Sequence, residues 1–395
     1  MVKWQKVKLA DCVNLLAGFP FKSQHFTDKR DDVPLVKGEN VSQGCILWDI
    51  SKRWLASDWG KMEKFHLLPG DVVVAMDRPW VPAGLKWAFI REGDPKALLV
   101  QRCARLRSSN GRLDQNFLRF VIGGPGFENY VIPITTGVNV PHISGQQILD
   151  FEFTLPPLPV QRRIAGILSA YDDLIENSQR RIRILEAMAR ALYREWFVQF
   201  RFPGHEKLPR VASPLGNIPE GWEVNLVRDI LSRRAAGTVY READVKPEGA
   251  TPVLDQSTDE FLGFHDNEPD HVASPAKPMA IFGDHTCKMQ ILVEPFSVGP
   301  NVVPFAAGRA LPTTYVFYMV NSLVQTQEYK RHWIPLNAKE IVVADRVSAQ
   351  RFASLIQPML VAQETLRKAI RNLRRTRDLL LPRLLSGNTV MPPRE

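Results

Sequence analysis

The stretch IAGILSAYDDLIENSQRRIRILEAMARALYREW (164–196) decides the fold, because apolar residues recur along it at alternating steps of four and three residues, the spacing of a coiled-coil seam. The stretch 352–384 repeats this spacing. Nine of ten seam positions in the first stretch and eight of ten in the second are apolar, whereas a chain that is 45% hydrophobic would give about four or five by chance. The shared register is less expected of two unrelated amphipathic helices, and it favours an internal duplication. The predicted seam positions are Ile164, Leu168, Tyr171, Ile175, Ser178, Ile182, Leu185, Ala189, Leu192 and Trp196 in the first stretch, and Phe352, Ile356, Met359, Gln363, Leu366, Ile370, Leu373, Arg377, Leu380 and Leu384 in the second.

Each helical stretch closes a longer unit, and the two units open alike. Alternating, strand-like residues begin them, at Trp4, Val7 and Leu9 and again at Trp222, Val224 and Leu226. The segment RFPGHEKLPRVASPLGNIPEG (201–221) between the units is rich in proline and glycine, which is typical of a linker. A repeat of this size predicts a pseudo-twofold object, with two facing helices as its axis and two similar domains as its arms.

Length and composition bound the class of protein. A chain of 395 residues can bury two sizeable cores. Its apolar runs are too short for a membrane-spanning helix, and the first residues lack the apolar region of a signal peptide, so we expect no membrane partner. The four cysteines have no CxxC spacing, which indicates neither a zinc site nor a disulfide framework and suits a reducing cytoplasm.

The charge is uneven along the chain. The formal net charge is +9 and the pI is about 9.4, a surplus compatible with binding a polyanion such as nucleic acid. Two interpretations of the densest basic run stay open: a solvated helix face, or direct contact with phosphates. That run consists of Arg367, Lys368, Arg371, Arg374, Arg375 and Arg377.

Several signatures of catalysis are missing from the sequence. It has no GxxxxGK[ST] phosphate loop, no Asn-Pro-Pro-aromatic methyltransferase motif, no GxGxxG loop and no HExxH or HxH metal motif. A loose D…DxK pattern of Asp71, Asp94 and Lys96 leaves a self-contained Mg²⁺-dependent restriction nuclease as an alternative. Both aspartates lie in ordinary turn sequences, which makes it the weaker alternative. A coiled-coil scaffold without DNA contact is a further one.

The segment LPPLPVQRRIAGILSAYDDLIENSQRRIRILEAMARALYREWF (155–197) resembles the central conserved region of type I restriction-modification specificity subunits. The second half departs from this pattern, because IVVADRVSAQRF (341–352) stands where Leu-Pro-Pro-Leu-Pro would be. It is therefore open whether Pro358 kinks the second helix or delays its start, and Pro382 is expected to end or bend that helix. Further segments similar to the family, in the family's order, are TTGVNVPHIS (135–144), GNIPEGW (216–222), PVLDQSTDEFLGFHD (252–266), IFGDHTCKMQILVEPFSVGPNVVPF (281–305) and RDLLLPRLLSG (377–387).

The resemblance implies a non-catalytic specificity subunit. Each globular half would be a target-recognition domain that reads one half of a bipartite, asymmetric site in double-stranded DNA, and the helices would hold the two domains at a fixed separation. The helices would also dock two methyltransferase subunits, which modify adenine N6 with S-adenosylmethionine. Restriction subunits that use ATP and Mg²⁺ would complete the complex. This chain itself would hold no cofactor and no metal, and it would act in a bacterial or archaeal cytoplasm.

Residues and resemblance together predict an α/β (α+β) fold in which two similar target-recognition domains are joined by two long helices that form an antiparallel coiled coil. The expected boundaries are 1–157 for the first domain, 158–200 for the central helix, 201–221 for the linker, 222–346 for the second domain, 347–387 for the C-terminal helix and 388–395 for a tail.

Candidate DNA contacts are polar residues in the loops of each domain. Bases are read by Arg or Lys at guanine and by Asn or Gln at adenine, whereas phosphates are held by Lys, Arg, Ser, Thr and backbone amides. In the first domain the candidates are Lys22, Ser23, Lys37, Asn40, Arg78, Lys86, Gln101 and His142. In the second domain they are Asp255, Gln256, Ser257, His285, Thr286, Lys288, Asn301 and Arg331.

Overall fold

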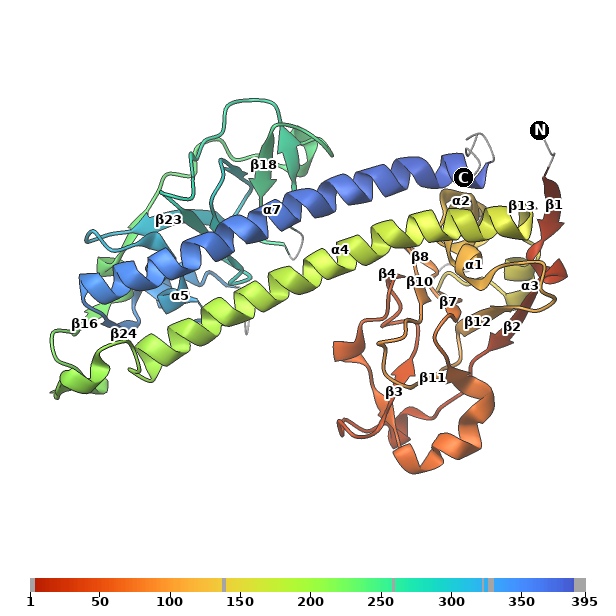
Figure 1. The fold of residues 1–395 in the computed structure, drawn as a ribbon, viewed down its shortest axis with the longest axis horizontal. Helices are drawn as coiled ribbons and strands as arrows, with labels where there is room; N and C mark the ends of the chain where they lie inside the picture. The colour runs from red at the N-terminus through yellow and green to blue at the C-terminus, as the bar shows by residue number, and fades with distance from the viewer. Residues whose placement is uncertain (1–3, 137–139, 258–259, 322, 326–329, 387–395) are drawn as a thin grey trace. The chain divides into compact units, whose positions relative to one another are not determined.

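The computed structural model describes residues 4–136, 140–257, 260–321, 323–325 and 330–386 (Figure 1). The chain divides into two compact units. Unit 1 is Met1–Ile175 with Arg371–Glu395, and unit 2 is Glu176–Ile370. Each unit therefore holds one globular half and one end of each long helix. The expected tail, 388–395, lies outside the described residues.

Two sheets form the globular half of unit 1. The first has the strand order β2 (Val13–Ala17), β12 (Cys103–Ser108), β7 (Val72–Ala75), β10 (Trp87–Phe89) and β4 (Gln43–Gly44). The second has the order β5 (Arg53–Trp54), β3 (Val33–Val36), β11 (Ala97–Leu99) and β6 (His66–Leu67). The centre of each sheet is a run of β-branched and aliphatic residues, and every residue of β3, β7 and β11 is buried, as expected for strands covered on both faces.

Shorter elements complete unit 1. Strand β1 (Gln5–Lys8) pairs antiparallel with β13 (Glu152–Leu155), and β8 (Trp80–Val81) forms a hairpin with β9 (Gly84–Leu85). Three helices follow the sheets: α1 (Gln115–Ile122), α2 (Pro125–Ile134) and α3 (Gly145–Leu149). Their starts follow capping rules, since the Asp114 carboxylate accepts the Asn116 and Phe117 amides and Ser144 forms a capping box with Gln147.

Unit 2 repeats the central part of this plan with one strand fewer in each sheet. Its first sheet has the strand order β17 (Leu231–Arg233), β23 (Val302–Ala307), β20 (Met279–Gly283) and β21 (Met289–Leu292). Its second sheet has the order β19 (Gly263–His265), β18 (Thr251–Leu254) and β22 (Ser297–Val298). Strand β16 (Glu223–Leu226) pairs with β24 (Glu340–Val343) as β1 pairs with β13, and β22 runs parallel to β18 as β11 does to β3. Helices α5 (Thr313–Val320) and α6 (Trp333–Asn337) stand in the places of α1 and α3. The common topology confirms that the two halves are similar mixed α/β domains.

The two long helices are continuous. Helix α4 (Leu158–Tyr193) passes into a π-helical turn, Arg194–Val198, and α7 spans Arg346–Leu385. Pro358 and Pro382 both lie inside α7, so the helix neither starts late at the first nor ends at the second. Packing on the core outweighs the hydrogen bond lost at Pro358, whose side chain is exposed between buried Ile356 and Leu360.

All twenty predicted seam positions are buried or half-buried, whereas several apolar residues off the seam are exposed, such as Leu174 at 52% and Leu355 at 46%. In unit 1 the start of α4, at Leu168, shares a core with the end of α7, at Leu384. In unit 2 the order is reversed, because Trp196 near the end of α4 lies 6.2 Å, ring to ring, from Phe352 near the start of α7. The helices are therefore antiparallel, as predicted.

Ion pairs accompany the seam in each unit. In unit 1 the Asp172 carboxylate accepts hydrogen bonds from Arg377 of α7, at 2.8 Å, and from Arg119 of α1, at 3.1 Å. Arg119 is buried, and burial lowers its pKa while Asp172 opposes that effect. In unit 2, Arg367 reaches Glu186 at 3.3 Å. The basic run of α7 is thus not simply a solvated face, since several of its cations are committed to ion pairs.

The segment 201–221 is more than a linker. It contains a hairpin of β14 (Arg210–Ser213) and β15 (Gly216–Pro219). Phe202 and Ile218 are buried in the core of unit 2, and Phe202 stacks on Trp222 with ring centroids 5.0 Å apart. Proline and glycine here shape tight turns whose apolar neighbours pack on the domain, so the segment belongs to unit 2.

Leu168→Ala should lower the free energy of unfolding by about 2–5 kcal/mol, because a fully buried leucine leaves both its transfer energy and a cavity behind. Leu168 is a sharper test of the seam than Leu185 or Leu373, which are only half-buried. The matched control is Leu174→Ala on the same helix, expected to cost less than about 0.5 kcal/mol. Urea unfolding of both variants would measure the difference, and equal costs would mean that the ladder is not a buried seam.

Candidate nucleic-acid interface

Loops at one end of the strands in unit 1 form a compact polar group, which we call loop cluster 1 (residues 37–40, 76–79, 86, 100–102 and 142). Backbone hydrogen bonds tie these loops together, from Met76 to Arg102 at 2.8 Å and from Arg78 to Pro141 at 2.6 Å. The Asp77 carboxylate lies 2.6 Å from Nδ1 of His142 and 3.7 Å from Nε of Arg102. One acidic group thus holds two cationic or potentially cationic side chains in a fixed position.

Two arginines of loop cluster 1 occupy the left-handed backbone region. The φ angles are +46° at Arg78 and +68° at Arg102, and both side chains are exposed. Non-glycine residues avoid this region, and such strain concentrates at functional loops where the surrounding structure enforces it. An exposed guanidinium on a rigid loop is suited to two parallel hydrogen bonds with a guanine edge or a phosphate.

Other predicted residues of the first domain have structural roles or lie apart. Asn40 is fully buried, where it accepts the Lys37 amide and donates to the Leu35 carbonyl and the Ser51 hydroxyl, so it cannot read a base here. Lys86 is half-buried against the Gly38 carbonyl, and burial lowers its pKa. Both residues were predicted to contact DNA, but in the structure their side chains stabilise loops. Sequence alone does not show which polar side chains are buried.

The remaining candidates of the first domain are accessible to different degrees. Lys37 is half-buried and pairs with Glu39 at 2.9 Å, whereas Gln101 is exposed within loop cluster 1. Lys22 and Ser23 are exposed on a separate turn, and among the described residues no hydrogen bond of the structure joins them to loop cluster 1. They stay predictions without support from this cluster.

The structure brings together all eight candidates of the second domain, in loop cluster 2 (residues 255–257, 284–288, 299–301 and 331–332). The Gln256 carboxamide oxygen accepts the His285 amide at 3.1 Å, and the Thr286 hydroxyl donates to the Gln256 carbonyl at 2.7 Å. The Asp255 carboxylate accepts the Ser257 hydroxyl at 2.7 Å. Arg331 lies 3.9 Å from Asp284, whose amide donates to the Asn301 carbonyl at 2.8 Å.

Loop clusters 1 and 2 are equivalent positions of the duplicated fold. Arg102 immediately precedes β12, and Asn301 immediately precedes β23, the strand with the equivalent place in its sheet. Both residues have positive φ angles, +68° and +59°. In each cluster a basic side chain faces a carboxylate, His142 with Asp77 and Arg331 with Asp284. Asp77, Arg102 and Asp284 were not among the predicted residues, although an alignment of the two halves by their strands would have indicated Arg102 opposite Asn301.

The two aspartates of the nuclease alternative form other interactions. Asp71 is almost fully buried, pairs with Arg107 and accepts the Leu68 amide at 2.8 Å. Asp94 accepts the Trp48 indole at 2.9 Å and the Arg91 amide at 2.8 Å. Across the described ranges, the structure holds no group of three or more His, Cys, Asp or Glu side chains placed to bind a metal. In the same ranges, no helix combines the length and apolar character needed to span a membrane.

Comparison with known proteins relates the first half of the chain to one family of domains. The model of the type I restriction modification DNA specificity domain matches residues 1–187. The MjaVIII type I restriction enzyme specificity subunit of Methanocaldococcus jannaschii is 29% identical over 44% of this chain and 40% of its own length. The MjaIX specificity subunit of the same organism is 25% identical over 69% of this chain and 68% of its own length.

The fold is also similar to that of a known protein. A crystal structure of a type I restriction-modification S subunit from M. genitalium superimposes with a TM-score of 0.61 at 16% identity, over 99% of this chain and 97% of that one. The first relatives matched in sequence align over less than half of their own length, 40% and 29%. Residues 1–187 thus match the type I restriction modification DNA specificity domain, and over nearly its whole length the chain is similar in fold to a type I restriction-modification S subunit.

Proposed function

We propose that this chain is the non-catalytic DNA-reading subunit of a type I restriction-modification complex and that its two loop clusters read the two halves of a bipartite site in double-stranded DNA. The observation that carries the proposal is the duplication of one polar loop cluster at equivalent positions of two similar domains. Two DNA-reading loop clusters on one chain match a DNA site that consists of two half-sites. The surplus of positive charge, +9, favours the approach to a polyanion.

Different side chains in the two clusters support an asymmetric site. Loop cluster 1 exposes Arg78 and Arg102, which suit guanine or phosphate. Loop cluster 2 exposes Asn301 instead, with Gln256 beside it, and amides of this kind suit adenine. The same scaffold thus presents two distinct sets of hydrogen-bonding groups, so the two half-sites should differ in sequence.

The catalytic steps belong to partners in this proposal. Two methyltransferase subunits would dock on the long helices and modify adenine N6 with S-adenosylmethionine, and restriction subunits would supply cleavage with ATP and Mg²⁺. The similarity in sequence supports this assignment, since the relatives are specificity subunits of restriction enzymes. This chain would bind neither cofactor.

Methyl transfer tests the proposal. The purified chain alone should transfer no methyl group from labelled S-adenosylmethionine to genomic DNA. Together with its methyltransferase partner it should direct methylation of adenines within one bipartite sequence, whereas the partner alone should not. Methyl transfer by the partner-free chain, or methylation by the pair without any sequence preference, would contradict the assignment.

Arg102→Asn should weaken binding of the cognate duplex about 10–100-fold, the range for one base or phosphate contact of about 1–3 kcal/mol. Asparagine tolerates a positive φ and occupies the equivalent position 301, so the backbone should persist without the guanidinium. Lys61→Gln, which removes an exposed cation elsewhere in unit 1, is the matched control. Fluorescence anisotropy at fixed salt would measure both, and equal affinities of the two variants would remove Arg102 from the interface.

A further inference from the structure

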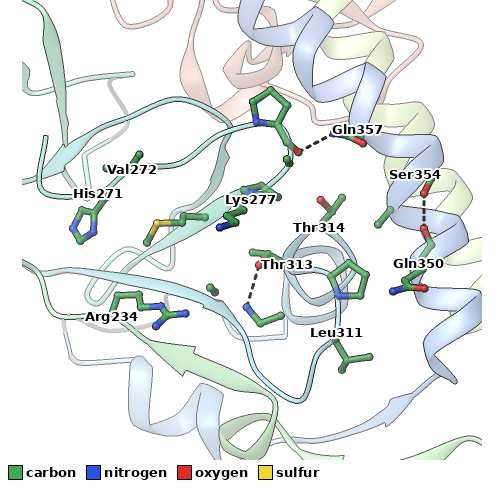
Figure 2. Close-up of a pocket in the computed structure, with 18 of the residues that line it drawn as sticks. Arg234, His271, Val272, Lys277, Leu311, Thr313, Thr314, Gln350, Ser354 and Gln357 are labelled. Atoms are coloured by element: carbon green, nitrogen blue, oxygen red, sulfur yellow. Dashed lines mark hydrogen bonds between the residues drawn. The ribbon is translucent and has the colours of Figure 1, made fainter.

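A cavity of about 990 Å³ opens in unit 2, between the sheet β17-β23-β20-β21 and the first half of α7 (Figure 2). Met279 at the start of β20 and Ala307 at the end of β23 line it. Loop cluster 2 adjoins the opposite ends of these strands, at Gly283 and Val302. The cavity is therefore a site separate from the proposed DNA-reading loops of the same unit.

Unused hydrogen-bond donors meet at one wall of this cavity, the first turn of α5. Pro312 stands at the N-cap and offers no side-chain cap, so the first backbone amides of this eight-residue helix lack an acceptor on the cap. The Thr313 hydroxyl accepts the Ala307 amide at 3.1 Å. The Thr314 side chain lies on the cavity side of α5 in Figure 2, is only 4% exposed, and within the described part of the chain its hydroxyl makes no hydrogen bond.

The charged side chains around the cavity leave an excess of positive charge. Arg234 and Lys277 line it, and neither forms an ion pair with another described residue. Burial lowers the pKa of His271, which keeps this imidazole neutral at physiological pH. Among the described residues of the lining, Asp270 is the one acidic side chain, and its carboxylate already accepts the Thr238 amide at 2.9 Å and the Ser297 hydroxyl at 2.7 Å.

From this arrangement we infer that the cavity binds the phosphate group of a nucleotide-sized small molecule. The first turn of α5 with the Thr314 hydroxyl would hold the phosphate oxygens, as helix N-termini commonly do, and Lys277 and Arg234 would neutralise its charge. Pro275, Pro278 and Leu311 give the remaining walls an apolar character suited to the body of the ligand. The volume lies at the upper end of the range of about 300–1,000 Å³ typical of small-molecule sites.

DNA carries phosphate too, so the test compares a free nucleotide with a duplex. Calorimetric titration of the full chain with AMP, and with inorganic phosphate, should show saturable binding. Lys277→Gln and Thr314→Val should each weaken AMP binding about tenfold, the factor expected when one hydrogen bond to a charged group is lost. The crossed control is Lys288→Gln in loop cluster 2, which should leave AMP binding intact and weaken only the duplex.

Each outcome decides for or against the inference. Loss of AMP binding in Lys277→Gln with normal duplex binding supports it, and the exposed position of Lys277 makes misfolding an unsuitable explanation. Circular dichroism melting checks the fold of Thr314→Val. Absence of binding of both AMP and phosphate to the wild-type chain overturns the inference. So does weaker duplex binding in Lys277→Gln, since the cavity would then serve the DNA backbone.

Discussion

Inserting one heptad into each long helix should increase the preferred gap between the two recognised half-sites by about three base pairs. Helices α4 and α7 each begin in one unit and end in the other without a break. Seven residues keep the apolar seam in phase and lengthen each helix by about 10.5 Å, at ~1.5 Å per residue. DNA rises ~3.4 Å per base pair, so this length corresponds to about three base pairs.

The pairing of the helices fixes where the insertions belong. Asp172 faces Arg377, so an insertion after Ser178 in α4 is matched by one after Ile370 in α7. A counter-effect is expected, because three base pairs also rotate one half-site by roughly a quarter turn or more, given ~10–10.5 base pairs per turn. Affinity at the best new gap should therefore fall below the wild-type value even though the preference shifts.

A library of duplexes with gaps of different length would measure this preference, by binding or by methylation in the presence of the partner. The control carries the same seven residues in the exposed turn between β14 and β15, which lengthens neither helix. It should keep the parental gap. If the variant with two longer helices also keeps the parental gap, the helices do not set the spacing.

Periodicity predicted the long helices because their burial follows directly from sequence. The alternating steps from Ile164 to Trp196 identify residues that must lie on one face of a helix, and the structure buries or half-buries every one of them. The duplication was visible for the same reason. The helix does not start late at Pro358, which is tolerated where neighbouring apolar residues hold α7 on its core, and Pro382 lies in the last turn of α7, which ends at Leu385.

The candidate site could be predicted only in part. The loops of the second domain were found because Gly283, Pro300 and their neighbours mark turns, and all eight candidates there meet in one cluster. Asn40 could not be recognised as a buried brace, since two of its three hydrogen bonds depend on Ser51 and Leu35. Arg102 was missed because its strained backbone arises from tertiary contacts, among them the bond from Met76.

Exchange of one sheet domain for that of a relative should replace one half of the recognised sequence completely. The exchange should be made at residues 199 and 345 rather than at the predicted bounds of the second domain, 222–346. Phe202 and Ile218 are part of the core of unit 2 and would otherwise be separated from Trp222. Unit 2 has its own core and its own loop cluster, so a graft with these boundaries should fold. Each mismatched base pair typically costs about 1–3 kcal/mol, so a new half-site of several bases should abolish binding to the original sequence.

Mapping methylated adenines across the genome of cells that express the exchanged chain with the methyltransferase partner tests the central claim most directly. The control variant carries the chain's own domain between the same altered junctions. It should recognise the same DNA sequence as the parental chain. The account predicts a bipartite sequence in which the half read by unit 2 is new, while the other half and the gap are those of the parent. A map in which both halves change, or in which the recognised sequence is a single uninterrupted block, would contradict the claim that two separate loop clusters each read one half-site.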